Sequence, residues 1–278
     1  MSFYDEVILK IQNIPQNPYS YRKRENSEDN TRELIFKGYT IPFQIDKEKN
    51  KLVTNLYLDM IDRVLDKIDH DEFIIIFDTN RETLLKKLIY KDYKANRATP
   101  SEFQKQCERS IMDNLLQLEY PYYSIEGYEA DQIISGICYL AQDKNIVTVI
   151  ATKDKDLYEL LKYADVLIYD KHEYYSKEDA IKKFEVLPEQ IGDYLSLVGD
   201  TSDNIPGVSK IGHVMASKLI TQYNSIENLY ANLESVSDKI KCLLENDKDK
   251  ALLSKQLTDL TPSKELLIAI KSNLLYLN

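Results

Sequence analysis

Two continuous apolar runs constrain the fold of this chain more than any other feature. Residues 73–77 and 146–150 are rich in β-branched and aromatic side chains, which is typical of strands buried on both faces. Helical patterns alternate with them: apolar residues recur at three- and four-residue steps from Leu56 to Ile68, and residues 130–141 also read as a helix. Strands that alternate with helices predict an α/β fold with a mainly parallel sheet.

The rest of the chain divides around this α/β part. In residues 1–33, an apolar stretch at 7–11 fits a short strand or a helical turn, and a polar run follows it, so we expect an atypical and partly disordered segment. Residues 34–185 form the predicted α/β unit, which includes a short helix at 157–161 and a third apolar strand at 166–169. Residues 186–278 are predicted to be helical, with helices at 191–197, 213–223, 226–231 and 250–258.

The composition excludes several classes of protein. Of the 278 residues, 43% are hydrophobic and 29% are charged, which excludes global disorder. No stretch approaches the roughly 20 apolar residues of a membrane span, and no signal peptide is recognisable, so we expect no membrane partner. Three scattered cysteines (Cys107, Cys138 and Cys242) form neither a disulfide framework nor a zinc motif, so we expect a reducing cytoplasm.

Acidic residues gather where the predicted elements end. They are Asp78, Glu129, Asp131, Asp154, Asp156, Asp200 and Asp203. Each one alone fits a turn or a helix start equally well. Together they favour a shared crevice, because the carboxyl ends of parallel strands meet at one edge of a sheet. Carboxylates packed there would repel each other unless they held Mg²⁺ or Mn²⁺, and two such ions about 3.5–4 Å apart can hydrolyse a phosphodiester.

The net charge of −10, from 36 basic and 46 acidic residues, argues mildly against a generic nucleic-acid binder. A protein that collects carboxylates to hold divalent cations is acidic for that reason, so the charge does not exclude a metal-dependent nuclease.

Several motifs containing these acids resemble the bacterial 5′-3′ exonuclease family, which includes the N-terminal nuclease of DNA polymerase I and the flap endonucleases. The motifs are Gly-Tyr-Glu-Ala-Asp at 127–131, Thr-Lys-Asp-Lys-Asp-Leu at 152–157, and Leu-Val-Gly-Asp-Thr-Ser-Asp-Asn-Ile-Pro-Gly at 197–207. Residues 93–97 are similar to the family's arch motif, and residues 251–257 to its C-terminal helix. The resemblance implies a PIN-like α/β core, a helical arch over the site and a C-terminal helix-three-turn-helix region.

The resemblance also implies roles for individual residues. Metal ligands are expected at Asp78, Glu129, Asp131, Asp154, Asp156 and Asp203, with Asp200 in the acidic shell. Lys94, Arg97 and Lys86 are expected near the scissile phosphate, where cations would neutralise developing charge. Tyr93 would stack on a base or pack in the core. A hairpin with Gly207, Lys210 and Gly212 would grip DNA and hold K⁺ on its backbone carbonyls. Lys218 would add a phosphate contact.

Three departures from the family pattern weaken the expected metal site. The family's first strand ends in Asp-Gly, whereas a strand at 7–11 would place Gln12 and Asn13 there, and Asp29 lacks a strand before it. The family's paired Asp-Asp is here Asp131 followed by Gln132. Lys210 replaces the middle glycine of the hairpin, which restricts its backbone. We therefore expect lower metal affinity at one position.

The leading hypothesis is a Mg²⁺- or Mn²⁺-dependent structure-specific 5′ nuclease with two metal ions. It would act on branched or 5′-flap DNA and on RNA–DNA primer junctions, as a monomer, with a separate DNA polymerase to fill gaps. The alternative is a catalytically weakened relative that binds branched DNA, which the departures favour. A PIN-type ribonuclease acting on single-stranded RNA is a third hypothesis, which the predicted DNA-gripping hairpin disfavours.

Overall fold

The computed structural model describes the backbone of residues 7–8, 32–36, 39–43, 47–144 and 146–274, and side chains from Asn50 onward within those ranges. Its central feature is a six-stranded sheet with the strand order β5-β4-β1-β6-β7-β8. The strands are β1 (Val7–Ile8), β4 (Ile75–Ile76), β5 (Tyr122–Tyr123), β6 (Thr148–Ala151), β7 (Val166–Asp170) and β8 (Glu173–Tyr175). A separate hairpin pairs β2 (Arg32–Phe36) with β3 (Tyr39–Phe43).

Most strands of the sheet share one direction. β4 pairs in parallel with β5, and β6 with β7. β1 lies between β4 and β6 and is antiparallel to both, so β4 and β6 also point the same way. Of the stretch predicted at 7–11, Val7 and Ile8 are therefore a strand, while Gln12, Asn13 and Asp29 lie outside the described residues. The carboxyl ends of β4 and β6 face the same edge, which confirms the predicted α/β class.

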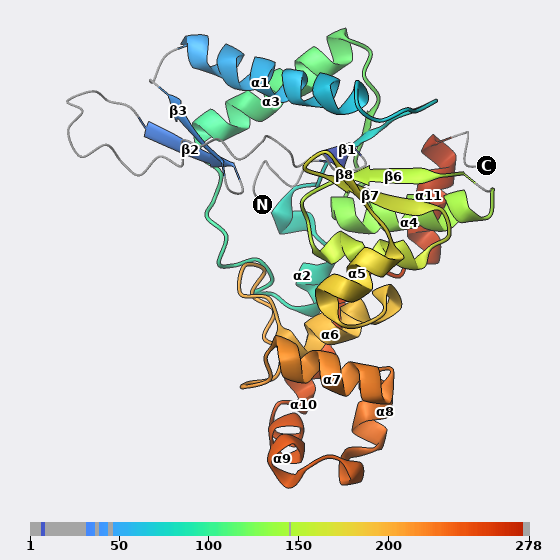
Figure 1. Ribbon diagram of the computed structural model, residues 1–278. Helices are drawn as coiled ribbons and strands as arrows, with labels where there is room; N and C mark the ends of the chain where they lie inside the picture. The colour runs from blue at the N-terminus through green and yellow to red at the C-terminus, as the bar shows by residue number, and fades with distance from the viewer. Residues whose placement is uncertain (1–6, 9–31, 37–38, 44–46, 145, 275–278) are drawn as a thin grey trace.

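Helices cover the two faces of the sheet (Figure 1). The alternation of side chains along β4 divides the core, because successive residues of a strand point to opposite faces. Ile74 and Ile76 pack with α4 (Ala130–Gln142), whereas Ile75 and Phe77 pack with α1 (Lys47–Leu65) and α3 (Glu102–Gln117). α11 (Lys264–Asn273) lies against α4. The run at 73–77 is continuous in apolar residues because both of its faces are covered.

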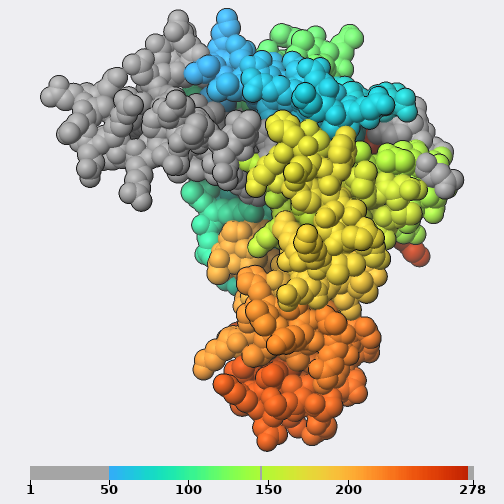
Figure 2. All heavy atoms as spheres, viewed as in Figure 1, coloured from blue at the N-terminus to red at the C-terminus, as the bar shows by residue number. Residues whose placement is uncertain are grey.

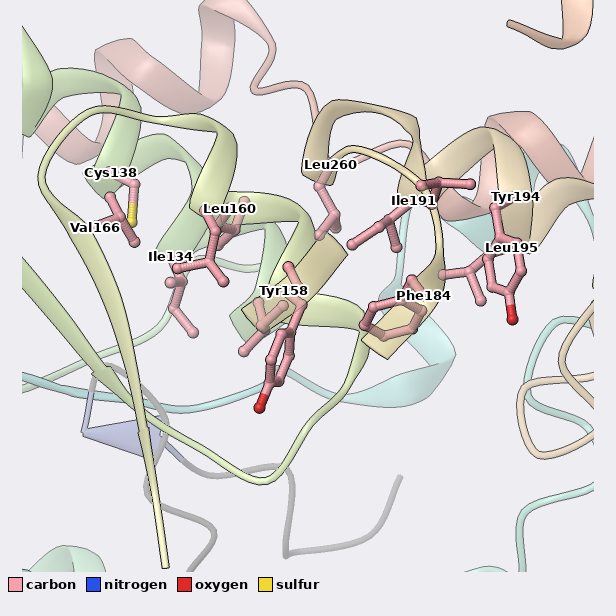
Figure 3. Close-up of a cluster of buried hydrophobic side chains, with 14 of the residues drawn as sticks. Ile134, Cys138, Tyr158, Leu160, Val166, Phe184, Ile191, Tyr194, Leu195 and Leu260 are labelled. Atoms are coloured by element: carbon pink, nitrogen blue, oxygen red, sulfur yellow. The ribbon is translucent and has the colours of Figure 1, made fainter. Parts of the chain in front are cut away.

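Four of the six α-helices between residues 177 and 258 were predicted from the sequence, whereas those at 177–184 and 238–246 were not. The six are α5 (Lys177–Phe184), α6 (Ile191–Val198), α7 (His213–Tyr223), α8 (Ile226–Ala231), α9 (Asp238–Asn246) and α10 (Lys248–Thr258). Figure 2 shows most of them as a lobe at one end of the molecule. The core is nonetheless continuous: Tyr158 and Ile134 of the α/β part share it with Phe184, Ile191 and Leu195 (Figure 3). The helix predicted at 157–161 is a 3₁₀-helix, Asp156–Lys162.

The segment where the arch was predicted is mostly turns. We call residues 80–100 the arch segment. It contains a 3₁₀-helix (Arg81–Thr83) and the short helix α2 (Lys86–Ile89), followed by turns from 91 to 97. Lys94 has φ +56°, a left-handed conformation that interrupts a helix. Within the described residues, no helix is long and apolar enough to cross a membrane.

Candidate active site: acidic residues beside arch cations

The end of strand β4 and the start of helix α4 come together at the site. Asp78 follows β4, and its Oδ1 accepts a hydrogen bond of 2.6 Å from the backbone N–H of Ala130, the first residue of α4. A carboxylate at a helix N-terminus is favourable, because the first N–H groups lack partners inside the helix. The contact holds Asp78 next to Glu129 and Asp131, as the sequence predicted for these strand and helix ends.

Glu129 lies at the centre of a buried cluster of cations. Lys86 Nζ is 2.8 Å from its Oε2, Lys94 Nζ contacts its Oε1, and the Tyr93 hydroxyl donates to both oxygens at 3.1 and 3.0 Å. Only 2% of Glu129 is exposed. Burial by itself raises the pKa of this carboxyl, but the two ammonium groups outweigh it and hold the pKa well below its usual range. Glu129 is therefore ionised and paired.

Asp203 joins the acidic loop to the arch segment. Its Oδ1 accepts from Arg97 Nε at 2.8 Å, and its Oδ2 is 3.7 Å from Lys94 Nζ. The backbone is joined as well, since the N–H of Lys94 donates to the Asp203 carbonyl at 2.9 Å. Asn204 Nδ2 donates to the carbonyl of Asp92 at 2.8 Å, and Asn96 Nδ2 donates to the carbonyl of Thr201 at 3.1 Å.

The other acids gather around Asp156. Burial raises the pKa of Asp156 well above its ordinary value, the charges of Asp154, Asp200 and Asp131 raise it further, and that of Lys155 lowers it. Asp156 N–H donates to Asp154 Oδ1 at 3.0 Å, while Asp156 Oδ1 is buried without a hydrogen-bond partner. An orphaned buried carboxylate oxygen among other acids fits a hard divalent cation.

The described residues do not form a complete set of metal ligands. In that part of the chain, no three acidic, histidine or cysteine side chains lie close enough to hold an ion together. Mg²⁺ needs only one or two carboxylates when it retains water ligands, so pairs of these acids remain able to hold it. Asp200 Oδ1 already accepts hydrogen bonds from the Ser202 backbone N–H at 2.7 Å and from its hydroxyl at 2.8 Å, which fixes one member of the group.

The predicted DNA-gripping residues lie in the helical region. Gly207 is buried, with φ +61°, and its N–H donates to Ser254 Oγ at 3.0 Å, so it packs inside the protein and does not face solvent. Lys210 is exposed with φ +67°, the left-handed conformation that a glycine would adopt more easily. Gly212 is the N-cap residue of α7, and Lys218 is exposed on that helix.

The structure corrects one predicted role and adds one residue, Arg81, that the sequence did not indicate. Tyr93 is 2% exposed and hydrogen-bonded to Glu129, so it cannot stack on a base in this conformation, and the core-packing alternative holds. Arg81 was not predicted, yet it donates to the backbone carbonyls of Arg97 at 2.7 Å and Ala98 at 3.2 Å. Its contacts are to backbone far along the chain, and a sequence pattern carries no signal of them.

The described residues combine an α/β sheet, strand-end carboxylates beside lysine and arginine, and a helical region, which is the architecture that the resemblance to PIN-like nucleases implied. The sequence profile described as 5′-3′ exonuclease, N-terminal resolvase-like domain, matches residues 30–185. The profile described as 5′-3′ exonuclease, C-terminal SAM fold, matches residues 186–275. The chain belongs to the 5′-3′ exonuclease family, which confirms the resemblance found in its motifs.

Individual relatives agree with this assignment. A 5′-3′ exonuclease of Buchnera aphidicola is 32% identical over 209 residues, covering 72% of this chain and 73% of that protein. DNA polymerase I of Lactococcus lactis subsp. cremoris is 32% identical over 270 residues, covering 89% of this chain and 31% of that protein. This chain therefore spans about a third of the length of that polymerase.

A solved structure supports the fold. The T5 5′-exonuclease with bound zinc ions superposes with a TM-score of 0.68 at 20% identity, covering 81% of this chain and 90% of that one. At this identity, the likeness establishes the shared architecture and not the details of the site.

Proposed function

We propose that this protein is a divalent-metal-dependent 5′ nuclease that hydrolyses phosphodiester bonds in 5′-flap or branched DNA and at RNA–DNA primer junctions. The observation that carries the proposal is the placement of Lys86, Lys94 and Arg97 against two acids from separate segments, Glu129 and Asp203. Phosphate, divalent cations and carboxylates are the groups that such a mixture of charges recognises. The T5 flap endonuclease, a relative in fold, has been solved in complex with DNA and metal ions.

As expected from the sequence, the protein would bind two ions of Mg²⁺ or Mn²⁺. They would be held by Asp131, Asp154, Asp156 and Asp200, with Asp78 nearby. Bound there, such ions supply an activated water and neutralise charge on the phosphate. The chain's own residues bind and orient the DNA: Lys94 and Arg97 attract the scissile phosphate and offset its developing charge. Asp203 and Glu129 fix these cations in place.

The helical region would grip the duplex next to the cleaved strand. Lys210 and Lys218 are exposed near the start of α7 and along it, where they can reach phosphates. The same proposal includes a K⁺ ion bound by the backbone carbonyls of residues 207–212. The three cysteines are free, and with a DNA substrate they favour the cytoplasm of the cell as the site of action. We propose that the protein acts as a monomer and leaves gap filling to a separate polymerase.

A weakened DNA-binding relative is the second candidate. Two predicted ligands, Glu129 and Asp203, are paired with cations of the chain itself, and Gln132 replaces an acid. This candidate predicts salt-sensitive binding to branched DNA with turnover near background.

Cleavage of a labelled 5′-flap duplex in Mn²⁺ decides between the two. We expect the wild type to release the flap, Asp131→Asn to lose activity by at least about a hundredfold, and Asp113→Asn, on the exposed side of α3, to match the wild type. Wild-type product no greater than that of Asp131→Asn would overturn the nuclease proposal. Faster cleavage of single-stranded RNA than of flap DNA would favour the ribonuclease.

A further inference from the structure

We infer that Glu129 positions the arch cations and does not bind a metal ion, although the family resemblance implies that it is a ligand. The inference rests on the proposed function, because it concerns the same site. It starts from the bonding capacity of the carboxylate, whose two oxygens offer about four lone-pair positions. Three donors meet these oxygens: Lys94 at Oε1, Lys86 at Oε2, and the single proton of the Tyr93 hydroxyl, which lies within reach of both.

Burial makes these contacts hard to exchange for a metal ion. The side chains of Glu129, Lys86 and Lys94 are 3%, 8% and 5% exposed. A metal ion on Glu129 would take its carboxylate away from two buried ammonium groups, and a buried charge that loses its partner is costly. Asp156 presents the opposite case, because one of its buried oxygens has no hydrogen-bond partner and the acids Asp154, Asp200 and Asp131 outnumber Lys155 as its charged neighbours.

The ring of Tyr93 completes the arrangement. Lys86 Nζ and Lys94 Nζ lie 5.5 and 5.4 Å from the centre of this ring, within the range of a cation–π contact. Glu129 holds both ammonium groups at one point, and Asp203 Oδ2 lies 3.7 Å from one of them, Lys94 Nζ. Glu129 thereby sets where the two cations lie relative to the phosphate.

Gln132 has a structural function that fits the same assignment. Its Oε1 accepts a hydrogen bond of 3.1 Å from the Glu129 N–H, at the start of helix α4. This hydrogen bond fixes the backbone of Glu129. The position that holds a second acid in the family thus holds an amide that orients the anchor of the arch cations.

Mn²⁺ titration of the DNA-free full-length protein, followed by the free-ion signal in electron paramagnetic resonance, tests the inference without cleavage. We expect Glu129→Gln to bind Mn²⁺ within about twofold of wild type, and Asp131→Asn to bind at least about tenfold more weakly. A tenfold loss in Glu129→Gln would overturn the inference and leave the nuclease proposal intact. A wild type that binds no Mn²⁺ and cleaves no flap would overturn both.

Single-turnover cleavage at saturating DNA tests the positioning role. If Glu129 acts through Lys94, then Glu129→Gln should slow cleavage, and adding it to Lys94→Met should slow that variant by less than about threefold. Multiplicative losses in the double variant would contradict the inference. If Glu129→Gln does not unfold cooperatively, Glu129→Asp replaces it in both measurements. The shorter side chain of aspartate cannot reach both ammonium groups, so we expect the same results.

Discussion

Arg97 and Asp203 join two loops that are 106 residues apart in the chain, with Arg97 Nε 2.8 Å from Asp203 Oδ1. Both side chains are 14% exposed, and a second guanidinium nitrogen contacts the same oxygen. The pair therefore ties the arch segment to the acidic loop in a largely dry environment. Removal of one partner from such a pair leaves the other charge buried and uncompensated.

We expect Arg97→Ala to lower the free energy of unfolding by about 3 kcal/mol, because Asp203 stays buried with only the more distant Lys94, at 3.7 Å, as a counter-ion. Urea unfolding at neutral pH measures the loss. The matched control is Arg109→Ala, whose partner Glu102 lies 2.9 Å away but where both side chains are about two-thirds exposed. Exposed pairs contribute less than about 1 kcal/mol. Equal losses in the two variants would show that the Arg97 pair is not structurally important.

Gly207→Ala should be far more destabilising than Gly212→Ala. A Cβ on Gly207 would lie 2.5 Å from the backbone nitrogen of Gly199, and φ is +61°, whereas a Cβ on Gly212 meets nothing within 4 Å. The clash is with backbone, which cannot yield without moving the acidic loop. We expect a loss of about 2 kcal/mol or more for Gly207→Ala and under about 0.5 kcal/mol for Gly212→Ala by urea unfolding. Similar stabilities would refute this account of the loop.

The elements of the fold were predictable because their residues are patterned locally. The apolar period gave helix α7 its observed ends and placed α6 within one residue, and the run at 146–150 lies over β6. Strand direction was also accessible, since helices separate the strands. The position and direction of β1 could not be predicted. Its antiparallel pairing with β4 and β6 depends on contacts across the sheet, and a strand of two residues carries too little pattern to indicate them.

At the site, the sequence located the acids but not their partners. Strand ends and helix starts placed Asp78 beside Ala130, as a parallel sheet requires. The pairing of Glu129 with two lysines depends on how the arch segment folds back, and Lys94 reaches it through a left-handed turn that no local pattern indicated. Contacts such as that of Arg81 with the Arg97 carbonyl, 16 residues along the same segment, are set by how the segment folds back on itself.

The three thiols should react at very different rates. Burial raises the pKa of Cys107 to about 11 and that of Cys138 to about 12, whereas Cys242 is exposed on α9. The thiolate is the reactive form, so Cys242 should be alkylated by iodoacetamide at pH 8 at least about a hundredfold faster than the other two. Mass spectrometry of digests gives the rates. Rapid labelling of Cys138 in the native protein would contradict the packing of α4.

Asp247 should make the hairpin sensitive to acid. Its Oδ1 accepts from Lys250 Nζ at 2.7 Å and its Oδ2 from the Ser209 N–H at 2.8 Å. These hydrogen bonds, that of Lys250 first, lower the pKa of Asp247 from 3.8 to about 2. Because the folded protein holds the ionised form more strongly, this contribution to stability is present above about pH 4 and is lost as the pH falls towards 2.

Asp247→Asn should therefore be less stable than the wild type at pH 7, and its stability should fall less between pH 4 and pH 2. Urea midpoints across that range, with Asp249→Asn as the exposed control on the same helix, measure both effects. The control should follow the wild-type curve. If Asp247→Asn also loses stability in parallel with the wild type below pH 4, the acid sensitivity arises from other carboxylates, and Asp247 does not anchor Ser209 through its charge.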